Sequence, residues 1–259
     1  VRSTFYRLAT IVGQGALVYL AGHLIKTTGN VQHAWSVVFF VLAAMFATLC
    51  VYHWFVLPRP ESDRPVLKGN NYLGEFFGTF AAFFKRKDIL LVLGFILTFR
   101  LGEAQLVKLV QPFLLDPVSK GGLGLTTSEV GIAYGTVGIT ALTLGGLVGG
   151  YLISRFGLKR CLWPMVFAIH TPDLVFVYLA TDLPQNLWLV SGALALEQFG
   201  YGLGFTAMLL YMIMVAEGEH KTAHYAICTG LMALGMMVPG MFSGRIQEYM
   251  GYQNFFIWV

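Results

Sequence analysis

The chain has 259 residues, of which 56% are hydrophobic and only 12% are charged, and its mean hydropathy is +0.68. Soluble domains are about 45–50% apolar and about 25% charged, so this composition excludes a soluble globular protein and predicts helices packed in lipid. The net charge is +4, and no basic run interleaves with aromatic residues, which argues against nucleic-acid binding. The three cysteines lie singly in apolar runs, so neither a disulfide framework nor a zinc site is expected.

Apolar runs of about 20 residues, the length that crosses a hydrocarbon core about 30 Å thick, recur along the chain. They predict spans at residues 8–25, 35–57, 89–115, 130–153, 161–180, 187–216 and 225–242, and an eighth that begins near residue 252. The expected fold class is therefore all-α, a multi-spanning membrane helix bundle of about seven complete spans and a truncated eighth. The chain starts at Val1 without a signal peptide and stops within an apolar segment, so we expect a fragment cut at both ends.

The longest polar gap, residues 58–88, follows the first two predicted spans. It opens with a charged, proline-rich stretch that reads as a linker. Phenylalanines then recur at helical spacing between residues 72 and 84, directly before Lys85-Arg86-Lys87. This pattern predicts an amphipathic helix, which lies in the cytoplasmic membrane interface or packs on the cytoplasmic ends of the bundle.

Three charges fall within the third predicted span, at Arg100, Glu103 and Lys108. Ionisable residues inside a span are costly and usually face a polar cavity or a partner. We interpret Arg100 and Lys108 as groups that attract an anionic substrate, and Glu103 as a proton carrier. Because Arg100 and Glu103 are i,i+3 neighbours, the alternative is a structural ion pair that only locks helices together.

Residues 145–160 join the fourth and fifth predicted spans through paired glycines and a basic loop. Glycines let membrane helices approach closely, and short basic loops stay on the cytoplasmic side. With the N-terminus inside, 12 of the 17 Lys and Arg residues fall in inside segments and three in outside segments, a strong positive-inside bias. The loop resembles the cytoplasmic signature of the major facilitator superfamily, although Ser154 stands where that signature usually has an acid. The residues that carry this resemblance, and an expected role in conformational change, are Gly150, Ser154, Arg155, Gly157, Lys159 and Arg160.

The major facilitator plan has six helices per half with a long cytoplasmic link between the halves. On that plan, residues 1–57 hold the last two helices of an N-terminal bundle and residues 58–88 are the cytoplasmic linker. Residues 89–259 then form a six-helix C-terminal bundle whose last helix is truncated.

Two further polar groups interrupt the fifth and sixth predicted spans. In His170-Thr171-Pro172-Asp173, the proline removes a backbone hydrogen bond and kinks the helix. His170 and Asp173 could relay protons or bind metal, although a hydrogen-bonded kink is the favoured reading. In the sixth span Glu197 precedes glycines at every second position, a pattern typical of close packing beside a polar cavity. We take Glu197 and Asp173 as further proton-coupling candidates and Tyr201 as a substrate-binding candidate, with a buried hydrogen-bonded acid as the alternative for Glu197.

Several chemistries find no support in the sequence. His220 and His224 have metal-compatible i,i+4 spacing but lack a third ligand, so no metal site is predicted. There is no GxxxxGK[ST] phosphate loop and no GxSxG or HExxH motif. We therefore expect no cofactor and no enzymatic activity, and any uphill transport would draw on an ion gradient.

Five runs extend the resemblance over almost the whole chain. They are residues 99–104 (FRLGEA), 197–202 (EQFGYG), 224–230 (HYAICTG), 236–240 (MMVPG) and 243–252 (SGRIQEYMGY). These runs resemble the AmpG-type muropeptide permeases, in the peptide–acetyl-coenzyme A transporter branch of the superfamily. The resemblance implies proton-coupled import of anhydromuropeptides across a bacterial inner membrane for cell-wall recycling. Such a substrate carries a sugar and several carboxylates, which would suit binding by Arg100 and Lys108. The other partners implied are protons and the lipid bilayer. We expect the protein to be a monomer.

Three alternatives stay open. Within transporters, the cargo could be acetyl-coenzyme A or another organic anion. A multi-spanning membrane enzyme could use His170 with Asp173, although no nucleophile or metal site accompanies them. A sensor or scaffold would predict that neutralising Arg100 or Glu197 leaves function intact.

Overall fold

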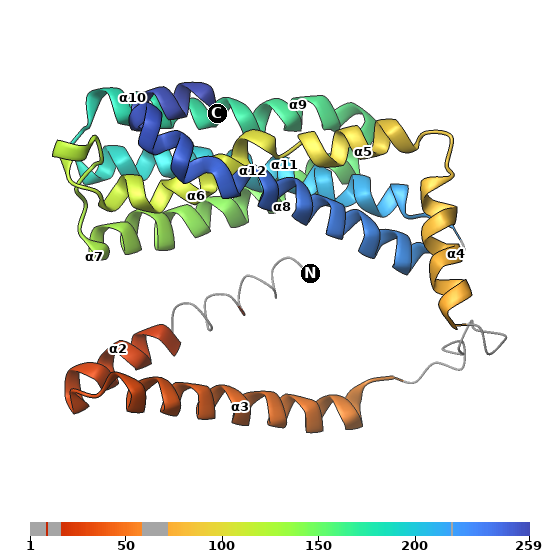
Figure 1. Cartoon of the computed structure of the whole chain (residues 1–259), viewed down its shortest axis with the longest axis horizontal. Coiled ribbons are helices and arrows are strands. Elements are labelled where there is room, and N and C mark those ends of the chain that lie inside the picture. Colours follow the sequence, from red (N-terminus) through yellow and green to blue (C-terminus); the bar gives the residue numbers. More distant parts are fainter. Residues whose placement is uncertain (1–8, 10–16, 59–71, 219) are drawn as a thin grey trace. The chain divides into compact units, whose positions relative to one another are not determined.

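The computed structural model describes residues 9, 17–58, 72–218 and 220–259, and these residues are helical apart from short connections, with no strand among them (Figure 1). The all-α prediction is confirmed. The helices are α2 (Leu17–Thr28), α3 (Val31–Val56), α4 (Tyr72–Phe84), α5 (Ile89–Thr98), α6 (Leu101–Leu115), the 3-10 helix η2 (Val118–Lys120), α7 (Thr127–Val130), the π-helix η3 (Gly131–Gly138), α8 (Ile139–Phe156), α9 (Leu158–His170), the 3-10 helix η4 (Thr171–Asp173), α10 (Leu174–Asp182), α11 (Leu187–Val215) and α12 (Lys221–Trp258).

The chain divides into two compact units, residues 1–70 and 71–259. In the first unit, α2 packs against α3, and Asn30 caps α3 by accepting a hydrogen bond from the His33 N–H at 3.0 Å. Large apolar side chains such as Phe40 and Phe55 are exposed along α3, as expected for a helix that lies in lipid. Of the first predicted span, residues 8–25, the part from residue 17 onward forms the start of α2, whereas residues 8 and 10–16 lie outside the described residues.

Among the described residues, six helical stretches are long and apolar enough to cross a membrane. They are Val31–Val56, Ile89–Leu115, Gly131–Phe156, Leu158–Asp182, Leu187–Val215 and Lys221–Trp258. Each of them covers most of a span predicted from the sequence. The eighth span was expected to begin near residue 252, and α12 breaks at Gly251, where φ is 76° and ψ is 166°, before Tyr252 starts its last helical segment.

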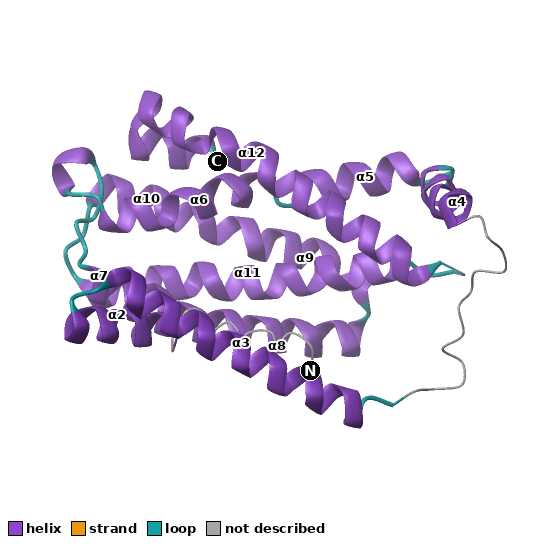
Figure 2. Ribbon diagram, turned by 60° about the horizontal axis from the view of Figure 1, so that its bottom comes forward, coloured by secondary structure: helices purple, strands orange, loops and turns teal. Residues whose placement is uncertain are grey.

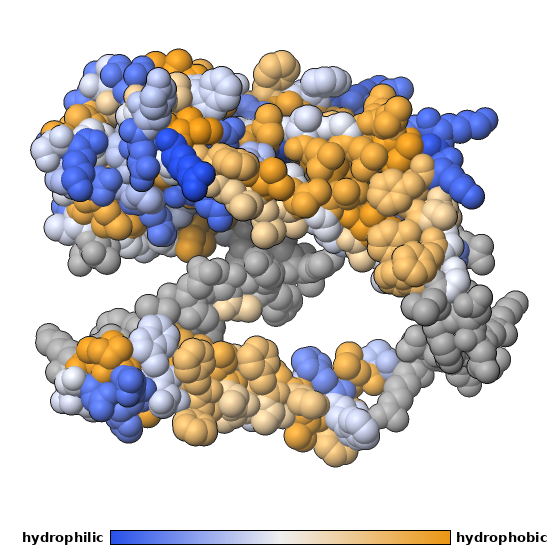
Figure 3. All heavy atoms as spheres, in the orientation of Figure 1, coloured by the Kyte–Doolittle hydropathy of each residue, from blue (hydrophilic) through white to orange (hydrophobic). Residues whose placement is uncertain are grey.

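In the second unit, α11 is the central helix, in contact with α8, α9, η3, α10 and α12. Figures 1 and 2 show it running between these neighbours along the length of the unit. Large apolar side chains on the outer surface of the unit, such as Phe77, Met237 and Met241, are exposed. Much of the surface over α4, α5 and α12 is accordingly hydrophobic in Figure 3, as is usual for helices that face acyl chains.

Glycines bring α8, α9 and α11 unusually close together. A Cβ atom at Gly202 of α11 would overlap the backbone of Leu142 and Gly146 in α8, and one at Gly200 would overlap the Ala168 carbonyl in α9. Residues two apart on a helix point to nearly opposite sides, so alternate glycines serve both neighbours of α11. The predicted close packing around these glycines is therefore present, and it sets the backbone of α11 directly against the backbones of α8 and α9.

Two of the membrane-length stretches contain a break near the middle, and a third begins irregularly. The stretch Ile89–Leu115 is interrupted between α5 and α6, where Arg100 has φ −113° and ψ 21°. The stretch Leu158–Asp182 passes through η4, as the proline at 172 predicts. The stretch Gly131–Phe156 starts with η3, and π-helical turns are frequent at functional sites.

Helix α4 contacts the bundle mainly through its C-terminal end. Phe83 is fully buried and packs beside His224 with ring centroids 5.4 Å apart, whereas Phe76 and Phe77 are 56% and 65% exposed. Just after α4, Arg86 donates a hydrogen bond to the Val215 carbonyl at the end of α11 and pairs with Asp88. The hydrogen bond that Arg86 donates to Asp88 lowers the pKa of this exposed carboxyl. One end of α4 thus packs on the bundle, while the rest carries an uncovered aromatic face.

The loop between α8 and α9 is a single residue, Gly157, with φ 79° and ψ 150°. Arg155 therefore lies in the last turn of α8, and Lys159 and Arg160 lie in the first turn of α9, where the sequence predicted a longer basic loop. All three are exposed. In Figures 1 and 2 this junction lies at the same end of the second unit as the C-terminal end of α4 and the junction between α11 and α12.

Candidate functional site

A buried ion pair lies where the third predicted span breaks. Arg100 Nε donates to Glu103 Oε2 at 2.8 Å and Arg100 Nη2 donates to Glu103 Oε1 at 2.6 Å, with the two residues only 5% and 1% exposed. The break places Arg100 at the N-cap of α6 and Glu103 in its first turn, so the i,i+3 spacing forms a bidentate pair. A carboxylate is also favoured at this position by the helix dipole.

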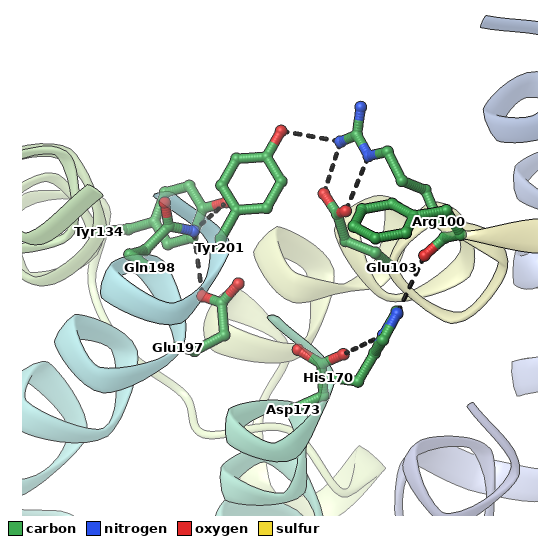
Figure 4. Close-up of polar contacts among 9 residues, drawn as sticks. Arg100, Glu103, Tyr134, His170, Asp173, Glu197, Gln198 and Tyr201 are labelled. Atoms are coloured by element: carbon green, nitrogen blue, oxygen red, sulfur yellow. Dashed lines mark hydrogen bonds and ion pairs between the residues drawn. The ribbon is translucent and has the colours of Figure 1, made fainter. Parts of the chain in front are cut away.

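Arg100 is also held by residues of α11. Its Nη2 donates a hydrogen bond to the Tyr201 hydroxyl at 2.7 Å, and its guanidinium lies 5.3 Å and 5.0 Å from the ring centroids of Tyr201 and Phe205. These two rings stack on one another at 5.6 Å. Cation–π contacts of this kind stabilise a desolvated guanidinium. Figure 4 shows Arg100 between Glu103 and Tyr201, so a single cation links α6 to α11.

A second polar group surrounds Glu197, one turn before Tyr201 on α11. The Gln198 amide donates to Glu197 Oε2 at 3.0 Å and to the Tyr134 hydroxyl at 3.2 Å. Glu197 is 3% exposed and forms no ion pair with any residue that the structure describes. Tyr134 belongs to the π-helix η3, so this group ties α11 to the irregular start of the fourth span.

The third polar group is formed by His170 and Asp173, on either side of Pro172. His170 Nε2 lies 2.9 Å from the Phe99 carbonyl oxygen, and its Nδ1 lies 3.8 Å from Asp173 Oδ2. A carbonyl oxygen can only accept, so Nε2 is the donor in the first contact. Figure 4 shows Glu103, Asp173 and Glu197 in one region of the bundle together with Arg100 and His170, and these residues are called the polar cluster below.

The structure brings together most of the residues that the sequence singles out within the spans. Arg100, Glu103, Asp173, Glu197 and Tyr201 lie in this cluster. Lys108 does not join it. The lysine lies about one and a half helical turns beyond Glu103 on α6. It is exposed there, is not ion-paired with any described residue, and packs beside Gly240 of α12.

The predicted loop residues lie away from this cluster, at the end of the bundle that carries the junction between α8 and α9. Ser154 donates a hydrogen bond to the Tyr151 carbonyl, and Arg155 lies 6.0 Å from the Phe156 ring. A Cβ atom at Gly150 would meet no atom within 4 Å, so this glycine takes no part in close helix packing. Within the described ranges, no group of His, Cys, Asp or Glu is arranged to hold a metal ion.

Sequence reasoning missed two members of the cluster. Gln198 follows the singled-out Glu197 directly, and a polar neighbour of a mid-span acid is a usable signal. Tyr134 carried no such signal, because a lone tyrosine in an apolar span is most often simply packed. Only the proximity of η3 to α11 gives this residue a polar role.

The chain is similar to known transport proteins along nearly its whole length. The family model described as Major Facilitator Superfamily matches residues 2–169. Over 97% of its length, the chain is 26% identical to the anhydromuropeptide permease of Escherichia coli K12, covering 48% of that protein. It is 25% identical over 97% of its length to a proposed transporter, AmpG 4, of Rickettsia conorii, covering 58% of that protein. The chain thus spans about half the length of the curated relatives it matches.

Proposed function

The chain belongs to the Major Facilitator Superfamily, and from this membership we propose that it acts as a secondary active transporter importing anhydromuropeptides together with protons across a bacterial inner membrane. The permease name of the Escherichia coli relative supports this substrate, as does the likeness of five sequence runs to AmpG-type permeases. An anhydromuropeptide carries carboxylates, and a buried arginine that can exchange partners is a suitable group to bind one.

The observation that carries the proposal is the buried pair of Arg100 and Glu103 at a break in a membrane-spanning helix. Ionisable groups at membrane depth are expensive and mark substrate or proton pathways. While Glu103 is ionised, both of its carboxylate oxygens accept hydrogen bonds from the Arg100 guanidinium. When Glu103 takes up a proton, Arg100 loses its counter-ion and becomes free to bind a carboxylate of the substrate. Proton and anionic substrate would therefore bind together, which is the requirement for symport.

Glu197 and Asp173 are proposed as further proton-coupling groups. Glu197 is buried, and the contact made by its carboxylate is with the neutral Gln198 amide. A buried charge without a counter-ion is costly, so such an acid is suited to gain and lose a proton during transport. Tyr201 would position Arg100 for the substrate, while Lys108 would contact a part of the substrate distant from Arg100.

The division of the chain into helices of an N-terminal bundle (1–57), a cytoplasmic linker (58–88) and a C-terminal bundle (89–259) is part of the same proposal. The gathering of basic residues around the junction between α8 and α9 and after α4 supports a cytoplasmic position for that end. The residues Gly150, Ser154, Arg155, Gly157, Lys159 and Arg160 would then form the loop that rearranges as the transporter changes access.

We propose transport rather than catalysis because the relatives described above are named a permease and a transporter. Among the described residues, moreover, no group of His, Cys, Asp or Glu that includes His170 and Asp173 could hold a catalytic metal ion. The remaining alternative within transporters, another organic anion such as acetyl-coenzyme A, fits the same Arg100 site, and the experiment below separates the two cargoes.

The decisive experiment is uptake of labelled anhydromuropeptide by the intact protein in liposomes, with and without an inward proton gradient. We expect gradient-driven uptake that is lost in Glu103→Gln and retained in Glu248→Gln, the same change at an exposed position of α12. Glu197→Gln should weaken the response to the gradient more than it weakens exchange of substrate at equal pH. Absence of wild-type uptake by folded protein would exclude this substrate, and a series of organic anions would be tested next.

A further inference from the structure

We propose that His170 is a positioning residue whose hydrogen bond to the Phe99 carbonyl joins the break between α5 and α6 to the 3-10 turn η4. This inference rests on the proposed function above, because it concerns how the Arg100–Glu103 pair is held during transport. Neither residue of the hydrogen bond touches substrate in the mechanism proposed there.

The Phe99 carbonyl is a backbone acceptor that the helix break sets free. The Phe99 N–H closes α5 by donating to the Phe95 carbonyl at 2.9 Å, and α6 opens with the Ala104 N–H donating to the Arg100 carbonyl at 2.8 Å. The carbonyl between these two bonds accepts instead from His170 Nε2, across 71 residues of sequence. At membrane depth water cannot satisfy a freed carbonyl, so a side-chain donor there stabilises the break itself.

His170 stands at a second break, on the neighbouring helix. It is the last residue of α9, and Pro172, which has no N–H, lies within η4 just after it. The ring is fixed on three sides: Nε2 faces the Phe99 carbonyl, Nδ1 faces Asp173 at 3.8 Å, and the Phe99 ring meets it edge-on with centroids 6.1 Å apart. The two breaks therefore lie side by side and share one side chain.

The hydrogen bond acts at the residue that precedes the functional pair. Arg100 directly follows Phe99, and its guanidinium must reach both Glu103 on α6 and Tyr201 on α11. Because α9 also packs closely on α11 through Gly200, the bond from His170 fixes Phe99 relative to the helix that bears Tyr201. The two breaks then form one joint, and the Arg100 guanidinium keeps its hydrogen bond to the Tyr201 hydroxyl as the helices bend.

His170→Gln and His170→Leu separate this role from simple packing. A glutamine amide can still donate to the carbonyl, whereas leucine fills similar space without a donor. A typical hydrogen bond contributes about 1 kcal/mol, so its loss should raise hydrogen–deuterium exchange of the peptide covering residues 96–104 by about five- to tenfold in His170→Leu. We expect His170→Gln to match the wild-type exchange, and uptake to fall about tenfold in the leucine variant while remaining within about twofold in the glutamine variant.

His220→Leu is the matched control, because His220 lies at the N-cap of α12 and contacts neither break. It should leave exchange of residues 96–104 unchanged. The inference is overturned if His170→Leu has wild-type exchange in this peptide, or if His170→Gln behaves like His170→Leu, since the donor would then not be what His170 supplies. The exchange measurement needs no substrate, so failure of the wild-type protein to take up anhydromuropeptide would reject the proposed cargo and leave the joint to be decided by exchange alone.

Discussion

Arg100 and Glu103 illustrate how a buried charge pair is held at the scale of single residues. Their i,i+3 spacing is visible in the sequence, and it allows the bidentate contact that the structure has. The sequence could not indicate that Arg100 also contacts Tyr201, because these two residues are separated by 101 positions. The ring that orders the guanidinium comes from another helix, and only packing brings it there.

Removing one partner of this pair should destabilise the protein more than removing both. Arg100→Gln leaves a buried carboxylate without its cation, and loss of one member of a buried ion pair typically costs about 3–5 kcal/mol. The double variant Arg100→Gln/Glu103→Gln leaves no unpaired charge and should recover most of that loss. Thermal unfolding in detergent measures the effect, with Arg245→Gln, an exposed change on α12, as the control. Additive losses in the double variant would show that the two side chains do not act as a pair.

At the scale of elements, the contact between α8 and α11 depends on backbone lying against backbone. Both Gly145 and Gly202 are at positions where a Cβ atom would overlap the facing helix. The glycine-rich stretches predict close packing, but every glycine in them looks alike in sequence. The structure distinguishes them, because Gly150 in the same stretch has open space where its side chain would be.

Gly202→Ala should therefore force α8 and α11 apart, with a loss of about 1–3 kcal/mol from overpacking. Gly192→Ala, on the same helix α11 but with no atom within 4 Å of the added methyl group, should be neutral or slightly stabilising because alanine favours the helix. Melting temperatures of the two variants in the same detergent give the comparison. Equal stability of both variants would contradict the close approach of α8 to α11.

At the scale of the whole molecule, charge determines how the chain is oriented in the membrane. The basic residues that follow α4 and those around the junction between α8 and α9 lie at one end of the second unit. Lys120, in η2, is exposed, and the third predicted span separates it in sequence from the basic residues that follow α4. The positive-inside rule then predicts opposite sides for the two regions.

This orientation can be tested with single cysteines introduced at Lys87 and Lys120 of the intact protein, after replacing the native cysteines by serine. In spheroplasts, we expect a membrane-impermeant maleimide to label Lys120→Cys from outside and to label Lys87→Cys only after lysis. Both positions are exposed, so a failure to react reports the side of the membrane and not burial. Labelling of Lys87→Cys in sealed spheroplasts would reverse the topology and remove the support for a cytoplasmic linker.

The sequence alone determined the class of the protein, the positions of most spans and the expected orientation, because these depend on hydrophobic length and on the distribution of charge along the chain. It also located the costly mid-span charges, since lipid makes such residues conspicuous. Only the tertiary structure decided which of them meet: Arg100 with Tyr201, Glu197 with Gln198 and Tyr134, and Lys108 with none of them. Such contacts depend on the packing of helices distant in sequence, and a hydropathy pattern carries no information about which neighbour a given helix face will find.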